Sequence, residues 1–220
     1  MSLCADLKQA IHRADPFTGF QAPDLEYDLE GWFGHVHVTD AVMDEFRPRS
    51  MIEVGTWKGQ SAIHFAKRMR GYHEDCALIC VDTWLGSREL WQKEHSSLNC
   101  RNGLPDVYRQ FMVNVVHEGL ADVIVPLALS SGEAAALLPK LDIDADAVYI
   151  DAGHGYPPVS ADLSGFWPLV RPGGVLFGDD YRPTFPGVVR AVDEFIAARE
   201  AEIKWSKIEA DKFIIAKPDC

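Results

Sequence analysis

The stretch Ala147–Tyr181, AVYIDAGHGYPPVSADLSGFWPLVRPGGVLFGDDY, decides the fold. It begins and ends with short apolar runs, at 147–150 and 174–177. Between the runs, five apolar residues recur at helical spacing: Val159, Leu163, Phe166, Trp167 and Val170. The turn sequence RPGG at 171–174 ends this helical pattern. Two short apolar runs flanking a helix predict a βαβ unit with parallel strands.

Acidic residues follow both predicted strands. Asp151 comes directly after the first, and the pair Asp179–Asp180 follows the second. The carboxyl ends of parallel strands lie side by side, so these three carboxylates should converge. They would repel one another unless a cation lies among them, and hard oxygen ligands suit Mg²⁺, Mn²⁺ or Ca²⁺ rather than Zn²⁺. His154 should stand beside that ion, and the combination predicts a metal-assisted active site.

Each of these residues also has an ordinary structural interpretation. Asp151 is a reasonable helix cap, Asp179–Asp180 a turn after a strand, and His154 a turn residue between two glycines. The presence of all of them at two neighbouring strand ends favours the functional interpretation.

Toward the N-terminus, an apolar strand at 51–54 runs into a glycine turn and a helix at 62–70. Strand, glycine turn and helix open nucleotide-binding α/β folds. The spacing Gly55-x3-Gly59 lacks the third glycine of a dinucleotide fingerprint, and no Gly-Lys-Ser/Thr follows. This disfavours a nicotinamide-dependent oxidoreductase and a P-loop. With Glu53 just before it, the turn suits a ligand without phosphate, although a plain tight turn remains an alternative.

The second strand, at 77–81, ends in Asp82-Thr83-Trp84. An acid at this place accepts hydrogen bonds from ribose hydroxyls, which is the role expected of Asp82. Trp84 is expected to stack on, or to wall off, a flat base.

Two segments are expected to face the substrate. The long stretch 85–102 predicts a lid at the carboxyl edge. Its candidate contact residues are Arg88, Trp91 and His95. The N-terminal segment 1–45 should form a helical rim, with Thr39 as the N-cap of a short helix. His35 and His37 are spaced like metal ligands on a strand, but no third nitrogen or sulfur ligand lies nearby, so a structural or rim role is favoured.

The remaining pattern predicts one domain, residues 1–220. Helices are expected at 107–118, 134–138 and 187–198, and strands at 123–127, 202–208 and 212–215. Ser131 is predicted either to cap the helix at 134–138 or to contact the bound base.

The composition of the chain argues against nucleic acid and membranes as binding partners. The chain has 220 residues, a net charge of −12 and a pI of about 5.0, which argues against sequence-independent binding to nucleic acid. No run of eighteen apolar residues predicts a membrane span, and the N-terminus lacks the apolar core of a signal peptide. The five cysteines include no CxxC pair, which favours reduced thiols and a cytoplasmic location.

Six motifs in order, EVGTWKG, VDTW, LSSGEA, YIDAGH, RPGG and FGDDY, resemble class I S-adenosylmethionine-dependent methyltransferases. The resemblance covers residues 50–217 and is strongest to the metal-dependent O-methyltransferase branch, in its macrocin O-methyltransferase and cephalosporin-hydroxylase-like group. Catechol O-methyltransferase is a more distant relative. The family implies a Rossmann-like fold: a mostly parallel seven-stranded sheet with helices on both faces and an antiparallel C-terminal strand. Its members often assemble as homo-oligomers.

The resemblance also implies residue roles. S-adenosylmethionine would be bound by Glu53, Gly55, Thr56, Gly59, Ser61, Asp82, Thr83, Trp84, Ser131 and Asp151. Asp151, Asp179 and Asp180 would bind Mg²⁺ or a similar hard cation, and His154 would be the base, where the catechol enzymes carry a lysine. The implied reaction is O-methylation of a small molecule such as a sugar, a catechol or phenol, or a natural-product scaffold. A non-catalytic protein that binds S-adenosylmethionine or another nucleoside for regulation remains the alternative.

Overall fold

A computed structural model describes residues 2–92 and 98–219, so the predicted lid residue His95 lies outside the described residues. The strands are β1 (Ser50–Val54), β2 (Ala77–Val81), β3 (Cys100–Arg101), β4 (Leu104–Pro105), β5 (Ile124–Leu127), β6 (Ala145–Ile150), β7 (Val170–Gly178), β8 (Trp205–Glu209) and β9 (Lys212–Ala216). The α-helices are α1 (Leu3–His12), α2 (Val36–Phe46), α3 (Gln60–Tyr72), α4 (Arg88–Gln92), α5 (Val107–His117), α6 (Ser131–Leu137), α7 (Tyr156–Phe166) and α8 (Pro186–Ala198). Short 3₁₀ turns occupy Leu138–Leu141, Trp167–Leu169 and Glu200–Glu202.

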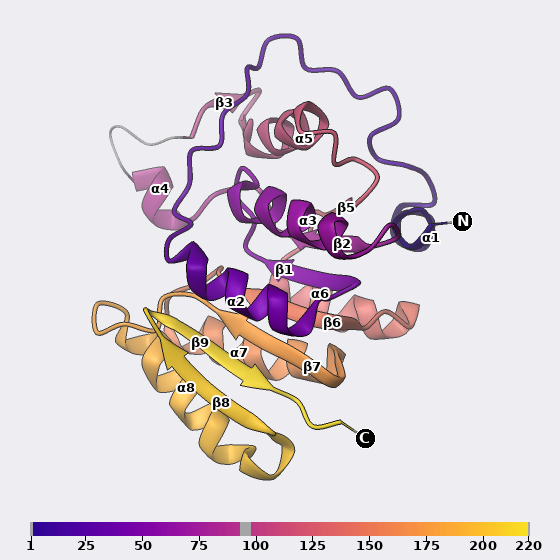
Figure 1. Cartoon of the computed structure of the whole chain (residues 1–220). Coiled ribbons are helices and arrows are strands. Elements are labelled where there is room, and N and C mark those ends of the chain that lie inside the picture. Colours follow the sequence, from indigo (N-terminus) through magenta and orange to yellow (C-terminus); the bar gives the residue numbers. More distant parts are fainter. Residues whose placement is uncertain (1, 93–97, 220) are drawn as a thin grey trace.

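One seven-stranded sheet, ordered β5-β2-β1-β6-β7-β9-β8, forms the centre of the molecule (Figure 1). The first five strands in this order are parallel, β9 is antiparallel to β7, and β8 is antiparallel to β9. Strand order reverses between β1 and β6, and ligands of open α/β sheets bind at the carboxyl ends of such strands. The expected mostly parallel sheet with an antiparallel C-terminal strand is confirmed.

Helices cover both faces of the sheet. On one face, α1, α6, α7 and α8 pack over side chains such as Ile52, Val148 and Leu176. On the other face, α2, α3 and α5 pack over the alternate residues, including Met51 and Phe177. Both faces of the central strands are therefore buried, which explains their continuous apolar runs.

The strand register lines up the functional turns. Val54 of β1 lies opposite Val81 of β2 on one side and Ile150 of β6 on the other. Ile150 in turn lies opposite Gly178 of β7. Since each of these residues ends its strand, the turns that follow all leave the sheet at the same edge.

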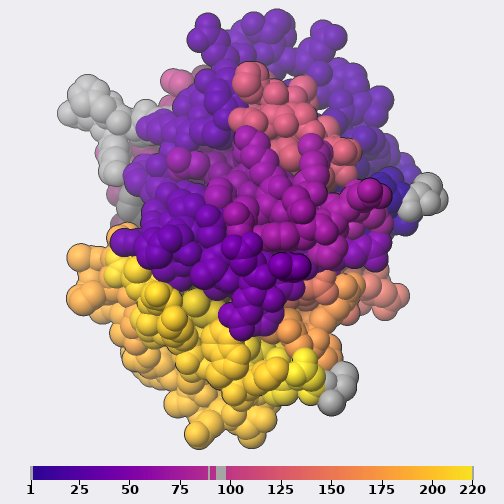
Figure 2. Space-filling model, in the orientation of Figure 1, coloured from indigo at the N-terminus to yellow at the C-terminus, as the bar shows by residue number. Residues whose placement is uncertain are grey.

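The N-terminal segment passes over α5 before it reaches α2, and Figures 1 and 2 show it in indigo across the top of the molecule. Asn114 of α5 accepts a hydrogen bond from the backbone of Asp28 and donates another back to it. Lys58, only 6% exposed, forms ion pairs of 2.6 Å with Asp28 and 2.8 Å with Glu30. These contacts tie the segment to the turn that follows β1.

Three local predictions were wrong. The helix expected after Thr39 begins at Val36, and the Thr39 hydroxyl instead donates to the Val36 carbonyl inside that helix at 2.9 Å. Thr is favoured at helix N-caps, but here the N-cap is His35, whose backbone adopts the left-handed conformation. The strand expected at 202–208 begins only at Trp205, because Glu202 still belongs to a 3₁₀ turn.

The third concerns the N-cap of α6, which is Ser130 and not Ser131. The Ser130 hydroxyl accepts from the Glu133 backbone N–H at 3.3 Å and donates to the Glu133 carboxylate at 2.9 Å. This Ser-x-x-Glu arrangement satisfies an otherwise free N–H at the helix start. Ser131 becomes the first residue of the helix.

No helix within residues 2–92 and 98–219 combines the length and apolarity needed to cross a bilayer.

Candidate active site

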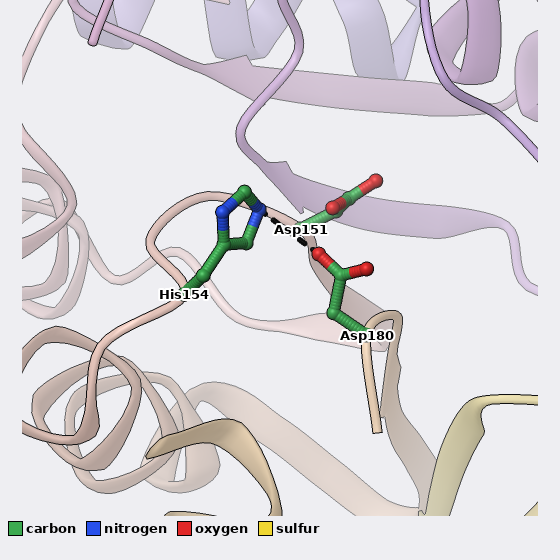
Figure 3. A group of neighbouring side chains, drawn as sticks. All are labelled: Asp151, His154 and Asp180. Atoms are coloured by element: carbon green, nitrogen blue, oxygen red, sulfur yellow. Dashed lines mark ion pairs between the residues drawn. The ribbon is translucent and has the colours of Figure 1, made fainter. Parts of the chain in front are cut away.

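Side chains from two strand ends converge at the carboxyl edge of the sheet. Asp151 follows β6, Asp180 lies two residues past the end of β7, and His154 stands on the turn between β6 and α7. One ligand atom from each of these residues lies within 4.8 Å of the other two (Figure 3). His154 Nε2 is 2.9 Å from Asp180 Oδ2. The structure thus brings together three of the four residues predicted for this site in one cluster.

Asp179, the fourth, has a different partner. The ammonium of Lys212, at the start of β9, donates a hydrogen bond to Asp179 Oδ2, and the Lys212 side chain is 0% exposed. The Tyr149 hydroxyl lies 3.4 Å from the same oxygen. Sequence reasoning missed Lys212, although a lysine at the head of the apolar strand KFIIA was a signal that it is buried and paired.

A second cation lies against Asp180. Arg182 donates to Asp180 Oδ1 at 2.6 Å, so both oxygens of this carboxylate have protein partners. Asp180 also holds a left-handed backbone conformation with φ of 64°, which Asp tolerates better than most residues. The three carboxylates that were predicted to need a bound cation therefore already have two positively charged side chains beside them, Lys212 and Arg182.

The surroundings change the pKa values of two residues of the cluster, Asp151 and His154. Burial and then the negative charges of Asp179 and Asp180 raise the pKa of Asp151 to about 7. The hydrogen bond with Asp180 raises the pKa of His154 above its ordinary value, although burial acts in the opposite direction. A cation near Asp151 would favour its ionised form.

A small cavity lies among these groups. Asp151, His154, Asp179 and Asp180 are among its lining residues, and it has about 10 Å³ of room for the centre of a water-sized sphere. That is about the space of a single water or a bare ion. The three aspartates supply carboxylates at its wall, and the rest of the lining is largely apolar, with Val159, Val188 and Phe213. A hard divalent cation fits both its size and its donors.

The turn after β1 touches the turn after β6. Gly55 has φ of 90°, and a Cβ added there would lie 2.0 Å from the backbone oxygen of Asp151. Gly59, at the start of α3, has φ of 91°, and its Cβ would meet the ring of Phe111 at 2.9 Å. Both glycines are therefore required by backbone conformation and by close packing.

Glu53 is buried beneath this turn with 0% exposure. Its Oε2 accepts a hydrogen bond from the Thr56 hydroxyl at 2.9 Å. Its Oε1 is buried and has no hydrogen-bond partner in the part of the chain that the structure describes. Burial raises the pKa of Glu53 to about 8. A carboxyl group with an unsatisfied oxygen is suited to a cationic ligand group. Ser61, 7% exposed, lies in the first turn of α3.

Asp82 organises the same region. One carboxylate oxygen accepts from the backbone N–H groups of Thr56 at 2.9 Å and Trp57 at 2.8 Å, and the other accepts from Trp84 at 2.7 Å. Asp82 thus fixes the turn after β1 as well as its own, a role that its position after the second strand did not reveal.

The model of a family described as a methyltransferase domain matches residues 52–181, which include the β1 turn, Asp82 and the acidic edge.

The chain belongs to this methyltransferase family.

Solved structures share the fold of this methyltransferase. An O-methyltransferase from Bacillus cereus, in complex with SAH, has 17% identity and a TM-score of 0.59, and the match covers 88% of this chain and 84% of that one. TomG, an O-methyltransferase from Streptomyces achromogenes involved in tomaymycin synthesis and solved with SAM, has 19% identity and a TM-score of 0.57, over 99% and 89% of the chains. A protein from Clostridium thermocellum proposed as an rRNA methylase has 10% identity and a TM-score of 0.58, over 86% and 100%. No curated protein matches the chain.

The other predicted donor residues of the methyltransferase, Trp84 and Thr83, differ in exposure. Trp84 is 2% exposed and packs against Tyr108 and Phe111, and its indole donates to the Trp57 carbonyl at 2.8 Å. This burial counts against stacking on a base and favours a wall beneath the site. The exposed Thr83 accepts from the Leu85 N–H at 3.3 Å.

The predicted rim residues that the structure describes contribute no atom to the Asp151–His154–Asp180 cluster. His35 and His37 lie at the start of α2 with ring centroids 6.1 Å apart, and they are not part of the cluster. In α4, Arg88 is exposed, and Trp91 is 53% exposed with its indole donating to the Leu85 carbonyl.

Proposed function

We propose that this methyltransferase transfers the methyl group of S-adenosylmethionine to a hydroxyl of a small molecule, assisted by a divalent cation at the acidic edge. The contact between Gly55 and Asp151 carries the proposal, because it joins the predicted donor turn directly to the cluster that would handle the acceptor. Donor and acceptor must meet within van der Waals distance for in-line transfer, and the two turns leave the sheet side by side.

Residues at the end of β1 and β2 would hold the donor. The unpartnered oxygen of Glu53 fits the ammonium of the methionine end, and the turn from Gly55 to Gly59 brings backbone close to it. Asp82 would accept ribose hydroxyls with the lone pairs that its three backbone bonds leave free. S-adenosylmethionine supplies a methyl group already activated by the sulfonium, so much of the rate would come from positioning.

His154 would take the proton from the acceptor hydroxyl. Asp180 orients the imidazole through the 2.9 Å contact at Nε2, and the Phe185 ring lies 4.5 Å from the imidazole ring. A bound cation would lower the pKa of the acceptor hydroxyl. Asp151, Asp179 and Asp180 are the predicted ligand set, and their presence at the wall of the small cavity supports a hard ion there.

A small-molecule acceptor is favoured by charge. The fold alone does not decide the acceptor, because one chain that shares it is described as involved in tomaymycin synthesis and another as a proposed rRNA methylase. A net charge of −12 opposes the approach of a polyanion, whereas a small hydroxyl compound is unaffected. A cytoplasmic location agrees with Cys4, Cys76, Cys80 and Cys100, which form no disulfide.

The test is formation of S-adenosylhomocysteine by the purified protein with a panel of sugars, catechols and phenols. We expect turnover with at least one acceptor, its loss on chelation, and its recovery on addition of Mg²⁺ or Mn²⁺. Full turnover in excess chelator would refute the metal assistance alone. Tight donor binding without product over a broad panel would instead support a regulatory protein.

A further inference from the structure

The Lys212–Asp179 pair is buried beside the acidic edge. The antiparallel register places Phe213 opposite Gly178, so Lys212 and Asp179 are the next residues outward on neighbouring strands. The Lys212 side chain is 0% exposed and that of Asp179 is 11% exposed. The ammonium also lies 5.9 Å from the Phe33 ring centroid. Separating a buried ammonium from its carboxylate partner is costly, so this pair is expected to stay together.

Asp151 and Asp180 are placed differently. Both contribute atoms to the cluster with His154, and Asp180 faces His154 and Arg182, which are half-exposed. Asp179 contributes no atom to that cluster. A cation entering the cavity would meet a fixed, buried positive charge behind Asp179, whereas Asp151 has no such direct partner among the described ion pairs. Asp180 is paired with Arg182, but that side chain is 42% exposed and, unlike Lys212, can leave its carboxylate for water. Repulsion from the ammonium thus disfavours coordination by Asp179.

We propose that Lys212 is a positioning residue that keeps Asp179 out of the cation's coordination shell, so that Asp151 and Asp180 are the carboxylates that hold the cation. The inference rests on the cation site of the proposed function and replaces its predicted three-carboxylate set. With two protein carboxylates, a cation such as Mg²⁺ keeps open positions for water and for oxygen atoms of the acceptor.

The first test uses Mn²⁺ alone as the probe. Asp179→Asn combined with Lys212→Met removes both charges at once and so leaves no unpaired buried ion. We expect its Mn²⁺ dissociation constant, measured by calorimetry, to stay within about threefold of wild type, while Asp151→Asn weakens binding by about tenfold or more. The relaxation of water protons by bound Mn²⁺ should be unchanged in the double variant, because no ligand is replaced by water.

The second test frees Asp179. Lys212→Met alone should tighten Mn²⁺ binding and reduce the water relaxation signal, because the released carboxylate displaces a water. A purely structural lysine would lower thermal stability without either change. Lys212→Arg keeps the positive charge and should restore wild-type Mn²⁺ affinity.

A tenfold loss of Mn²⁺ affinity in the double variant would show that Asp179 is a ligand and would overturn the proposal, as would the absence of Mn²⁺ binding to the wild type. If the double variant does not fold, unchanged affinity in Lys212→Met is the result that overturns it. None of these measurements needs turnover, so they remain decisive even if no acceptor is found. Conversely, methyl transfer without Mn²⁺ binding would preserve the activity and remove this inference.

Discussion

A Cβ placed on Gly55 would lie 2.0 Å from the backbone oxygen of Asp151, so this position has no room for a side chain. Neither atom can retreat easily, because both belong to turns fixed by neighbouring strands: the Asp151 N–H donates to Val54, and the Gly55 N–H donates to Val81. The donor turn and the acidic edge are therefore coupled by backbone contact, not through side chains that rearrange.

This coupling predicts that Gly55→Ala disrupts both sites. The new methyl would force the two turns apart and would also occupy a left-handed conformation, at a cost of about 1–2 kcal/mol for the conformation alone. We expect loss of donor binding by calorimetry together with a clear fall in melting temperature. Gly119→Ala is the matched control, because Gly119 has φ of 65° but no atom within 4 Å of its built Cβ. Equal effects of the two substitutions would contradict the role of the contact.

Asp82→Ala should lower both stability and donor affinity. It would leave three backbone N–H groups without their acceptor, and each buried group left unpaired costs about 1–3 kcal/mol. The donor should lose a further ~1.5–3 kcal/mol of binding from the ribose contacts. Chemical denaturation and donor titration measure the two effects separately. Unchanged donor affinity in a variant that is still folded would remove Asp82 from the donor site.

Glu53 should make donor binding depend on pH. Its pKa is 4.5 in a model compound and about 8 in the fold, so the folded chain holds an extra proton between these values. Its contribution to the free energy of unfolding is thus fully present below pH 4.5 and is lost as pH rises through 8. A cationic donor favours the carboxylate, so binding at pH 7 should release a proton, and affinity should rise up to about pH 8.

Calorimetry in buffers of different ionisation enthalpy counts that proton. Glu53→Gln should abolish both the release and the pH dependence. Donor binding at pH 7 without any proton release would place the ammonium elsewhere.

His154→Ala should lower the transfer rate by about 10²–10⁴, the usual worth of a positioned base, with donor binding unchanged. Because the hydrogen bond with Asp180 raises the pKa of His154 above its ordinary value of 6.5, the acid limb of kcat/KM should have its inflection above pH 6.5. The limb should vanish in the variant. His73→Ala is the control, since the His73 imidazole contacts the Arg47 carbonyl and the Tyr72 ring at the C-terminal end of α3, away from the site. A wild-type rate across pH 6 to 9 would show that His154 only shapes its turn.

The sequence predicted most of the sheet because its signals are local. Apolar runs at 51–54, 77–81 and 174–177 gave strands within a few residues of those observed, and the acids after them were placed at one edge. What each acid contacts depends on residues distant in the chain. Lys212 reaches Asp179 across thirty-three positions, and no periodicity announces such a pair.

The partners of two predicted donor residues, Asp82 and Trp84, also depend on the assembled fold. Asp82 was expected to accept hydrogen bonds from ribose, and in the structure its oxygens also accept from backbone N–H groups of a turn twenty-five residues away. Trp84 was expected to stack on, or to wall off, a flat base, and an aromatic pocket buries it, which favours the wall. In both cases the residue type was informative, whereas its partner required the assembled fold.

Asp179 and Asp180 are adjacent in the chain yet face different neighbours, Lys212 for one and His154 for the other. A single-residue deletion within β7 would move Asp180 into the place of Asp179, and Asp179 into the place of Gly178, while it left the DD dipeptide intact. Insertions in the loops beyond the sheet would not. We therefore expect this chain to tolerate changes in the length of its loops but not an insertion or deletion within β7. An alignment that matched only the DD dipeptide would miss such a shift.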